Sequence, residues 1–333
     1  MRGFKWFIRT IFCVAAATMS ALLTGSCGEK YRFDEGMVWH TTYHITYKSD
    51  KELSDSVLAV LREVGASLNV FDPASLASRV NVADSVAINE DYRTVYEMSR
   101  RINKETDGAF DPTLGPLITA WGFGKGHKAT SDTLRLDSLL AITGIERTYI
   151  SGDMIIKGDR RIEFNFSAIA KGYGCDRVAA MLERNGVKDY LVEIGGEIRC
   201  AGISPSGGDW KISIDRPVTT DRINHTSQCV VAFSGKGMAT SGNYRNFHES
   251  GGERYGHTIS SRTGRPVRTD VLSATVIAPT AMEADALATS MMALGSEKAM
   301  SLASKRCLPA MLILADSTVL VTPQFNAAKV KAP

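Results

Sequence analysis

The chain has 333 residues, 44% of them hydrophobic and 23% charged, which excludes a disordered, collagen-like or multi-spanning membrane protein. Its 39 basic and 36 acidic residues give a formal charge of +3, and Arg2, Lys5 and Arg9 account for this excess, so the remainder is neutral. A nucleic-acid-binding domain normally carries a basic excess, and we therefore expect no nucleic acid partner.

The first 26 residues are predicted to be an export signal. The three basic residues precede an uncharged, mostly apolar stretch at 10–23. This order is typical of a secretory signal, and 14 residues are too few to form a comfortable permanent span of a bilayer. We therefore expect the mature protein to be exported.

Cys27 directly follows two small residues, Gly25 and Ser26. This arrangement resembles a bacterial lipobox, in which the cysteine is lipidated and becomes the new N-terminus, although Thr24 stands where Leu is usual. We expect a signal at 1–26, a lipid-anchored tether at 27–36 and a single domain at 37–333. An ordinary signal peptidase site, with Cys27 an incidental thiol, remains the alternative.

Hydrophobic periodicity, β-branched runs and turn residues predict the elements of the domain. In chain order they are a strand at 38–47, helices at 52–65 and 91–106, two short strands within 144–156, a helix at 167–184, strands at 190–194, 210–214, 229–233 and 274–277, a last helix between Thr280 and Gly295, and a hairpin at 311–321. Because strands and helices do not alternate strictly, we predict an α+β fold with mixed sheets and packed helices.

The ends of two predicted helices carry recognisable signals. Ser167 is available as N-cap of the helix at 167–184, and Asn185-Gly186 can end it. Thr280 and Glu283 fit a capping box. The four cysteines of the domain, Cys175, Cys200, Cys229 and Cys307, lack zinc-site spacing, and we interpret them as small core residues, with disulfides left open.

Common nucleotide and hydrolase motifs are absent from the sequence. There is no G-x-x-x-x-G-K-[ST] phosphate loop and no G-x-S-x-G elbow. The glycines at 122–126 follow no clear strand and lack dinucleotide-fingerprint spacing. A Rossmann or α/β-hydrolase function is therefore disfavoured.

Eight segments resemble, in order, the ApbE family of FAD:protein FMN transferases. They are Thr41-Thr42-Tyr43, 75–81, 108–113, 170–173, Ile194-Gly195-Gly196-Glu197, 239–244, 263–266 and 285–289. The resemblance extends from about residue 38 to 300. Members of that family are commonly exported lipoproteins, in agreement with the interpretation of residues 1–27.

The resemblance implies a Mg²⁺-dependent transfer of FMN from FAD to a Thr or Ser hydroxyl of another protein, with release of AMP. The acceptors would be subunits of electron-transport complexes that carry a D-x-x-[ST]-G-A-[ST] motif. It also implies a protein anchored to the bacterial membrane through its lipid and facing the periplasm.

Asp285 and Thr289 are four residues apart on a predicted helix, so both side chains can reach one cation. A carboxylate and a hydroxyl are hard oxygen donors that suit Mg²⁺ better than zinc. The family's third ligand is a main-chain carbonyl, which maps onto Ala168. Without the family pattern, Asp285 would be interpreted as a solvated charge.

The resemblance also assigns residues to FAD. Lys171 would lie in the first turn of a helix, whose N-terminus attracts anions. Asn165 stands where relatives usually have Asp. The other residues that match cofactor-binding positions are Trp39, Thr41, Phe71, Ala109, Phe110, Asp111 and Ile259. Phe110 as a core residue and Asp111 as a turn residue are the alternatives.

His257 matches a family histidine near the reacting phosphates and would act as a general base toward the acceptor hydroxyl, with a purely structural histidine as the alternative. Two departures from the family pattern stand near the site. Trp39-His40 replaces Met-Gly before Thr-Thr, and Ser260-Ser261 replaces Asp-Pro. The competing functions are an FAD pyrophosphatase and a non-catalytic flavin-binding lipoprotein.

Overall fold

A central sheet of eight strands organises the computed structural model, which describes residues 30–123, 132–217, 227–242, 247–250, 253–256 and 258–330. Every neighbouring pair of its strands is antiparallel. In spatial order the strands are β1 (Lys30–Val38), β2 (Thr41–Ser49), β6 (Tyr190–Ile194), β7 (Glu197–Ala201), β10 (Lys236–Gly242), β13 (Val271–Ala278), β14 (Ala310–Leu314) and β15 (Val319–Val321). The predicted α+β class is confirmed.

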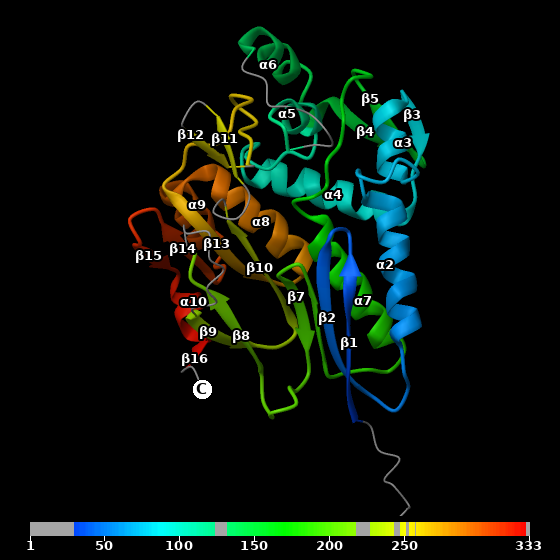
Figure 1. Ribbon diagram of the computed structural model, residues 1–333, viewed down its shortest axis with the longest axis vertical. Helices are drawn as coiled ribbons and strands as arrows, with labels where there is room; N and C mark the ends of the chain where they lie inside the picture. Colours follow the sequence, from blue (N-terminus) through cyan, green and yellow to red (C-terminus); the bar gives the residue numbers. More distant parts are fainter. Residues whose placement is uncertain are drawn as a thin grey trace, which may run out of the picture.

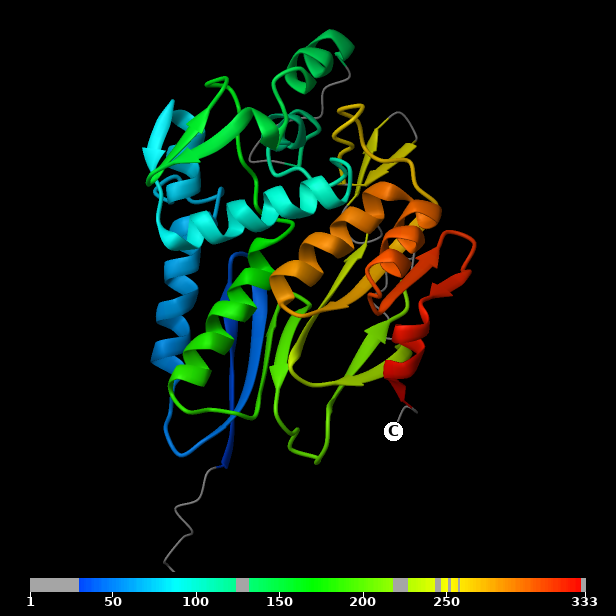
Figure 2. The same ribbon diagram turned by 180° about the vertical axis from the view of Figure 1, so that it is seen from behind.

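Helices cover one face of this sheet, as Figure 2 shows from behind. They are α2 (Ser54–Leu68), α4 (Glu90–Glu105), α7 (Ala170–Arg184), α8 (Ala281–Leu294) and α9 (Ser296–Lys305). Helix α8 is buried along nearly its whole length, and the largest apolar cluster fills the space between these helices and the sheet. Such burial supplies most of the stability of a fold of this size.

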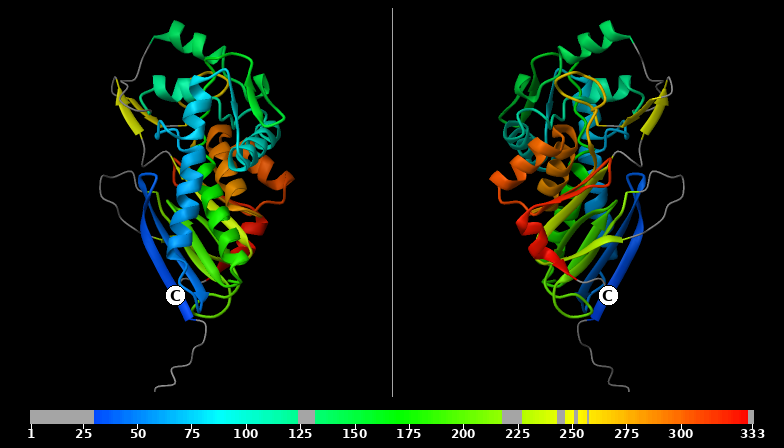
Figure 3. Two further views of the ribbon diagram at one scale, coloured as in Figure 1. Left: turned by 90° about the vertical axis from the view of Figure 1, so that its right-hand side faces the viewer. Right: turned by 90° about the vertical axis from the view of Figure 1, so that its left-hand side faces the viewer.

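A smaller sheet packs on the opposite face, visible edge-on in Figure 3. It consists of β8 (Trp210–Asp215), β9 (Ser227–Phe233) and β16 (Lys329–Val330), and α10 (Pro323–Ala328) lies beside it. Alternate residues of β8, including Ile212 and Ile214, face a second apolar cluster that also contains Met238 and Met311 of the large sheet. This inward and outward alternation is what a strand with one solvent-facing side requires.

The remaining elements gather at the upper end of the molecule in Figure 1. They are α3 (Leu76–Val82), β3 (Ser85–Ala87), α5 (Gly115–Ala120), α6 (Thr133–Leu140), the 3₁₀ helix η1 (Ile145–Arg147), β4 (Thr148–Ser151), β5 (Met154–Lys157), β11 (Phe247–Ser250) and β12 (Glu253–Gly256). A third apolar cluster, which includes Leu117 and Ile259, joins α5 to the segment after β12.

Most predicted elements are present, but several elements, among them α3, α5, α6, β7 and β10, were not predicted, and some predicted bounds are wrong. The strand predicted at 38–47 is two strands that meet at a turn, and the predicted tether extends too far, because residues 30–36 lie in β1. Helix α7 begins at Ala170 instead of residue 167, and α9 and α10 were not predicted. Gly295 is the C-cap of α8 and also the N-cap of α9. The glycine therefore ends one helix as predicted, but a second helix follows it directly.

All four cysteines of the domain are free thiols; Cys175 and Cys200 are buried as predicted, whereas Cys307 is exposed. Among the residues that the structure describes, no helix combines the length and the apolar character needed to cross a membrane.

Candidate active site

One cavity of about 980 Å³ brings together most of the residues that the sequence singled out. Those that line it are Trp39, Phe71, Ala109, Phe110, Asp111, Asn165, Ala168, Lys171, Ile259, Asp285 and Thr289. Thr41 does not line the cavity but lies directly against the Cα of Gly195, which does. Cys27 and His257 lie outside the described residues.

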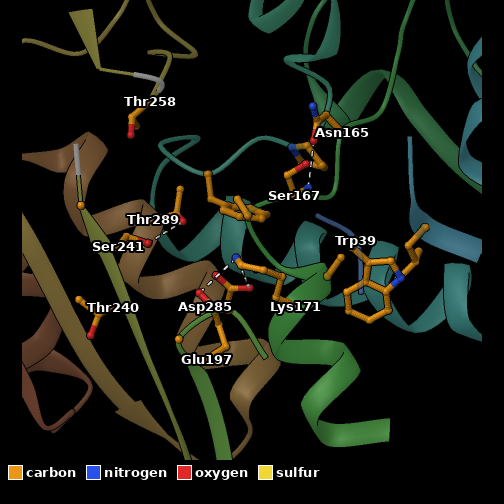
Figure 4. Close-up of a pocket in the computed structure, with 18 of the residues that line it drawn as sticks. Trp39, Asn165, Ser167, Lys171, Glu197, Thr240, Ser241, Thr258, Asp285 and Thr289 are labelled. Atoms are coloured by element: carbon orange, nitrogen blue, oxygen red, sulfur yellow. Dashed lines mark hydrogen bonds and ion pairs between the residues drawn. The ribbon is translucent and has the colours of Figure 1, made fainter. Parts of the chain in front are cut away.

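Three buried or half-buried charged side chains, those of Lys171, Glu197 and Asp285, lie at one end of the cavity. We call these residues and Thr289 the charged end. The ammonium of Lys171 lies 3.1 Å from Glu197 Oε1 and 4.0 Å from Asp285 Oδ2. The side chains of Glu197 and Asp285 are 5% and 2% exposed, whereas Lys171 keeps 30% of its surface exposed at the cavity. Figure 4 shows Lys171 reaching toward both carboxylates.

Burial and mutual attraction set the protonation of these groups. Burial raises the pKa of Glu197 and of Asp285, and the nearby ammonium only partly offsets this. Burial lowers the pKa of Lys171, but Asp285 and Glu197 outweigh it, and the pKa ends above its usual value. Lys171 therefore keeps its charge beside two carboxyl groups that burial makes harder to ionise.

Helices α7 and α8 cap one another, and this fixes the charged end. Asp176 of α7 accepts hydrogen bonds from the N–H groups of Ala281 and Met282 at the start of α8, at 2.9 and 2.8 Å. In return, Asp285 of α8 accepts from the N–H of Gly172 in the first turn of α7, at 3.1 Å. The predicted N-cap role of Ser167 is therefore wrong: α7 starts three residues later, and Asp285 satisfies one of its first-turn N–H groups.

The two helices approach closely because residue 172 has no side chain. A Cβ atom on Gly172 would lie 2.3 Å from the carbonyl oxygen of Ala281, and one on Gly237 of β10 would lie 2.2 Å from the Ala281 N. The predicted capping box is confirmed, since Thr280 accepts from the N–H of Glu283 at 3.2 Å. Glycines on two neighbouring elements therefore hold the start of α8, and with it Asp285, in place.

The chemistry of the charged end fits a hard divalent cation. Asp285, Thr289 and Ala168 all line the cavity, and the Thr289 hydroxyl is hydrogen-bonded to Ser241 at 3.0 Å. The second oxygen of Glu197 is buried without a hydrogen-bond partner among the described residues. The described part of the chain contains no group of three His, Cys, Asp or Glu side chains that could hold a metal ion. A cation would therefore be bound by a carboxylate together with hydroxyl and carbonyl oxygens.

Aromatic side chains form the other end of the cavity, which we call the aromatic end and define by Trp39 and Phe71. The indole of Trp39 packs where Gly65 of α2 and Gly174 of α7 leave room, because a Cβ on either would come within 2.7 Å of it. Figure 4 shows Trp39 set apart from the charged cluster. A long, partly aromatic ligand with a charged middle could therefore span both ends.

Two predicted contacts are already occupied by local hydrogen bonds. Asp111 accepts from the N–H and hydroxyl of Thr113 at 2.8 and 2.6 Å and from the N–H of Ile145 at 3.3 Å, so it acts at least as a turn residue. Burial raises its pKa, although these hydrogen bonds lower it. Asn165 lines the cavity, and its Oδ1 accepts from the N–H of Ser167 at 2.9 Å.

The Ser260-Ser261 pair, which replaces the family's Asp-Pro, has a structural role in this chain. Ser260 Oγ accepts from the N–H groups of Arg262 and Thr263 at 3.2 and 3.3 Å, which is the turn-forming role that an Asp side chain performs. Ser261 Oγ donates to the carbonyl of Gly108, next to the cavity-lining Ala109. Hydroxyls therefore keep the turn together in place of the carboxylate.

Several cavity residues were not predicted as functional. Glu197 and Ser241 lie in family-like segments but received no role, and the wall formed by Ser213, Asp215 and Thr258 was not anticipated. What identifies Glu197 and Ser241 as site residues is their contacts with side chains of other elements. Glu197 pairs with Lys171 of α7, and Ser241 is hydrogen-bonded to Thr289 of α8.

Comparison with known proteins decides the family. The model of the ApbE family matches residues 39–312. The chain belongs to the ApbE family. It is 34% identical over 311 residues to an FAD:protein FMN transferase of Haemophilus influenzae, with 88% of this chain and 89% of that protein covered. It is 37% identical over 292 residues to that of Vibrio cholerae, covering 84% and 86% of the two chains.

Solved structures of ApbE proteins share the fold. The flavin transferase ApbE from Vibrio cholerae superposes with a TM-score of 0.81 at 32% identity, over 90% of this chain and 99% of that one. The apo form of the Pseudomonas stutzeri flavinyl transferase ApbE gives 0.82 at 30% identity, over 90% and 97%. The whole domain, and not one motif, is therefore of the ApbE type.

Proposed function

We propose that this ApbE protein transfers FMN from FAD to a Thr or Ser hydroxyl of an acceptor protein in a Mg²⁺-dependent reaction that releases AMP. The observation that carries the proposal is the single cavity with an aromatic end and a charged end, because FAD joins a flat ring system to a pyrophosphate. The names of the relatives support the same activity.

The residues of the cavity have distinct tasks in this proposal. Trp39, Phe71 and Ile259 surround the flavin with apolar surface, and the NH₂ of Asn165 hydrogen-bonds its polar edge or the ribityl chain. Lys171 and the N-terminus of α7 attract the pyrophosphate. Asp285, Thr289 and the Ala168 carbonyl would hold Mg²⁺, which as a Lewis acid polarises phosphoryl oxygens.

The transfer breaks the phosphoanhydride bond of FAD and forms a phosphoester bond to the acceptor. The acceptor oxygen forms a bond to the phosphorus of the FMN half while the bond from that phosphorus to the AMP oxygen breaks, and AMP leaves with the electron pair. His257 takes the proton of the acceptor hydroxyl. The cavity walls orient FAD so that the acceptor oxygen meets the phosphorus in line with the leaving group.

If His257 is the base, the transfer rate should rise through its pKa, about 6.5 for an unperturbed imidazole. His257→Ala should lose roughly 100-fold in turnover, keep its affinity for FAD and lose the acidic limb of the profile. A retained acidic limb in that variant, at saturating Mg²⁺, would assign the proton to another group.

Incubation of the protein with FAD, Mg²⁺ and a peptide of the form D-x-x-[ST]-G-A-[ST], followed by mass spectrometry of the peptide, tests the function. Transfer adds FMN to the peptide and releases AMP. Free FMN with AMP and an unmodified peptide would indicate an FAD pyrophosphatase, whereas intact FAD would indicate a flavin-binding lipoprotein. Either result would refute the proposal.

We also propose that the protein is exported and anchored to the bacterial membrane through Cys27, facing the periplasm, where it modifies subunits of electron-transport complexes. The sequence of residues 1–27 supports this location. Intact-mass analysis of membrane-extracted protein should show a diacylglyceryl adduct on Cys27. An unmodified or absent Cys27 would leave the protein without its proposed anchor.

A further inference from the structure

The turn between β1 and β2 has an unusual backbone for its residues. Only Trp39 and His40 separate the paired residues Val38 and Thr41. Both have positive φ, 48° for Trp39 and 62° for His40. A two-residue hairpin requires this conformation, and Asn or Gly normally provides it, because a side chain at positive φ crowds the backbone. Both residues therefore carry a backbone cost, which is larger for Trp39 than for His40, because His adopts positive φ more readily than bulky residues do.

Packing compensates for the strain at only one of them. The indole of Trp39 fills the space between α2 and α7 that Gly65 and Gly174 leave open. His40 is exposed and has no hydrogen bond or ion pair within the described part of the chain. Its ring packs against Phe71, edge to face, with ring centroids 6.5 Å apart and planes at 89°. Within the described part of the chain, the polar atoms of the His40 ring therefore play no part in holding the turn.

Uncompensated backbone strain in folded proteins concentrates at ligand-binding positions. We infer that His40 is a flavin-contacting residue, which together with Phe71 forms an aromatic corner at the mouth of the cavity. Trp39 and Phe71 line the cavity, and the ring of His40, which does not line it, packs perpendicular to that of Phe71. A planar ring system can lie on one of two perpendicular rings while it meets the edge of the other. This inference rests on the proposed function, since it takes FAD to be the ligand.

The ApbE-like pattern, with Gly where this chain has His40, supplies the decisive variant. His40→Gly removes the ring and relieves the strain in one step, so stability and binding should change in opposite directions. We expect the Tm to rise by roughly 2–4 °C. The Kd for FAD should rise by about three- to tenfold, the loss expected for one aromatic contact.

Two further variants distinguish the effect of the aromatic ring on FAD binding from the effect of the turn conformation. His40→Tyr keeps an aromatic ring at the same φ and should bind FAD within about twofold of the wild type without a gain in Tm. His40→Asn tolerates positive φ but has no ring, so it should bind as weakly as His40→Gly. Isothermal titration calorimetry with FAD gives each Kd, and thermal unfolding of the same samples gives each Tm.

The inference is overturned if His40→Gly and His40→Asn bind FAD as tightly as the wild type, whatever their Tm. Weak binding by His40→Tyr would also overturn it, because the ring would then not be the group that matters. A wild-type protein that fails to bind FAD would instead refute the proposed function. The two failures are thus distinguished by the wild-type titration alone.

Discussion

At the charged end of the cavity, Lys171, Glu197 and Asp285 are held by two helices that cap one another, whereas at the aromatic end an exposed His40 stands on a strained two-residue turn. The charged residues match family-like segments of the sequence, and the Trp39-His40 pair departs from the family pattern. The contrast suggests a fixed site for phosphate chemistry and a variable rim that recognises the flavin. Substitutions at each end test whether this division holds.

The largest effect is expected for Asp285→Asn. The change removes a buried charge that would hold the cation, so turnover should fall by about 100-fold or more while the affinity for FAD changes much less. Transfer of FMN to the acceptor peptide at saturating FAD and Mg²⁺ measures it. Asp316→Asn, in the turn between β14 and β15, is the control and should behave as the wild type. Normal turnover of Asp285→Asn would refute the assignment of the charged end.

Lys171→Met should destabilise the protein because it leaves two buried carboxylates without their cation. We expect the free energy of unfolding to fall by about 3 kcal/mol. The double variant Lys171→Met/Glu197→Gln has one buried carboxylate fewer and should recover part of this stability without recovering affinity for FAD. Urea unfolding and FAD titration of the two proteins give both values. Full recovery of FAD binding in the double variant would show that Lys171 does not contact the substrate.

Gly172→Ala should disturb the mutual capping of α7 and α8. Its Cβ would meet the backbone of Ala281, which cannot move without displacing α8, and we expect a loss of about 2 kcal/mol together with reduced turnover. Gly207→Ala is a matched control, since its Cβ would meet nothing and only its positive φ would cost about 1 kcal/mol. Equal losses in stability and unchanged turnover in both variants would mean that the close helix contact does not position the site.

The pH dependence of stability should reveal the buried cap Asp176. Burial raises its pKa to about 6, although the N–H groups of Met282 and Ala281 lower it. Because the unfolded chain loses this proton first, the contribution is present below pH 4 and lost as the pH rises to about 6. The difference in unfolding free energy between wild type and Asp176→Asn should therefore change by about 3 kcal/mol between pH 4 and 7. A constant difference would place the pKa of Asp176 near its ordinary value.

Local sequence signals predicted the elements better than their ends. The capping box at Thr280 located α8 and the Asp316-Ser317 turn located the last hairpin, because both signals act within a few residues. The start of α7 was misplaced, since the group that satisfies one of its first N–H groups is Asp285, more than 100 residues away. The turn at Trp39-His40 was missed because neither residue is a usual turn former.

The site shows the same limit. Family-like motifs found Asp285, Thr289 and Lys171, and the fold brings all three to one cavity. Nothing near Glu197 in the sequence indicates that it is buried beside Lys171, because that contact depends on the pairing of β6 with β7 and on the packing of α7. Likewise, helical spacing could not show that Asp285 is buried, and its depth is what shifts its pKa.

The division between the two ends is tested most directly by measuring two quantities for Asp285→Asn and His40→Gly: the FAD Kd and the single-turnover rate of FMN transfer at saturating FAD. We expect Asp285→Asn to lose about 100-fold or more in rate with a small change in Kd, and His40→Gly to lose about three- to tenfold in affinity with a rate close to the wild type. If both variants changed the same quantity, or if Asp285→Asn kept its rate, the charged and aromatic ends would not have the separate roles assigned to them.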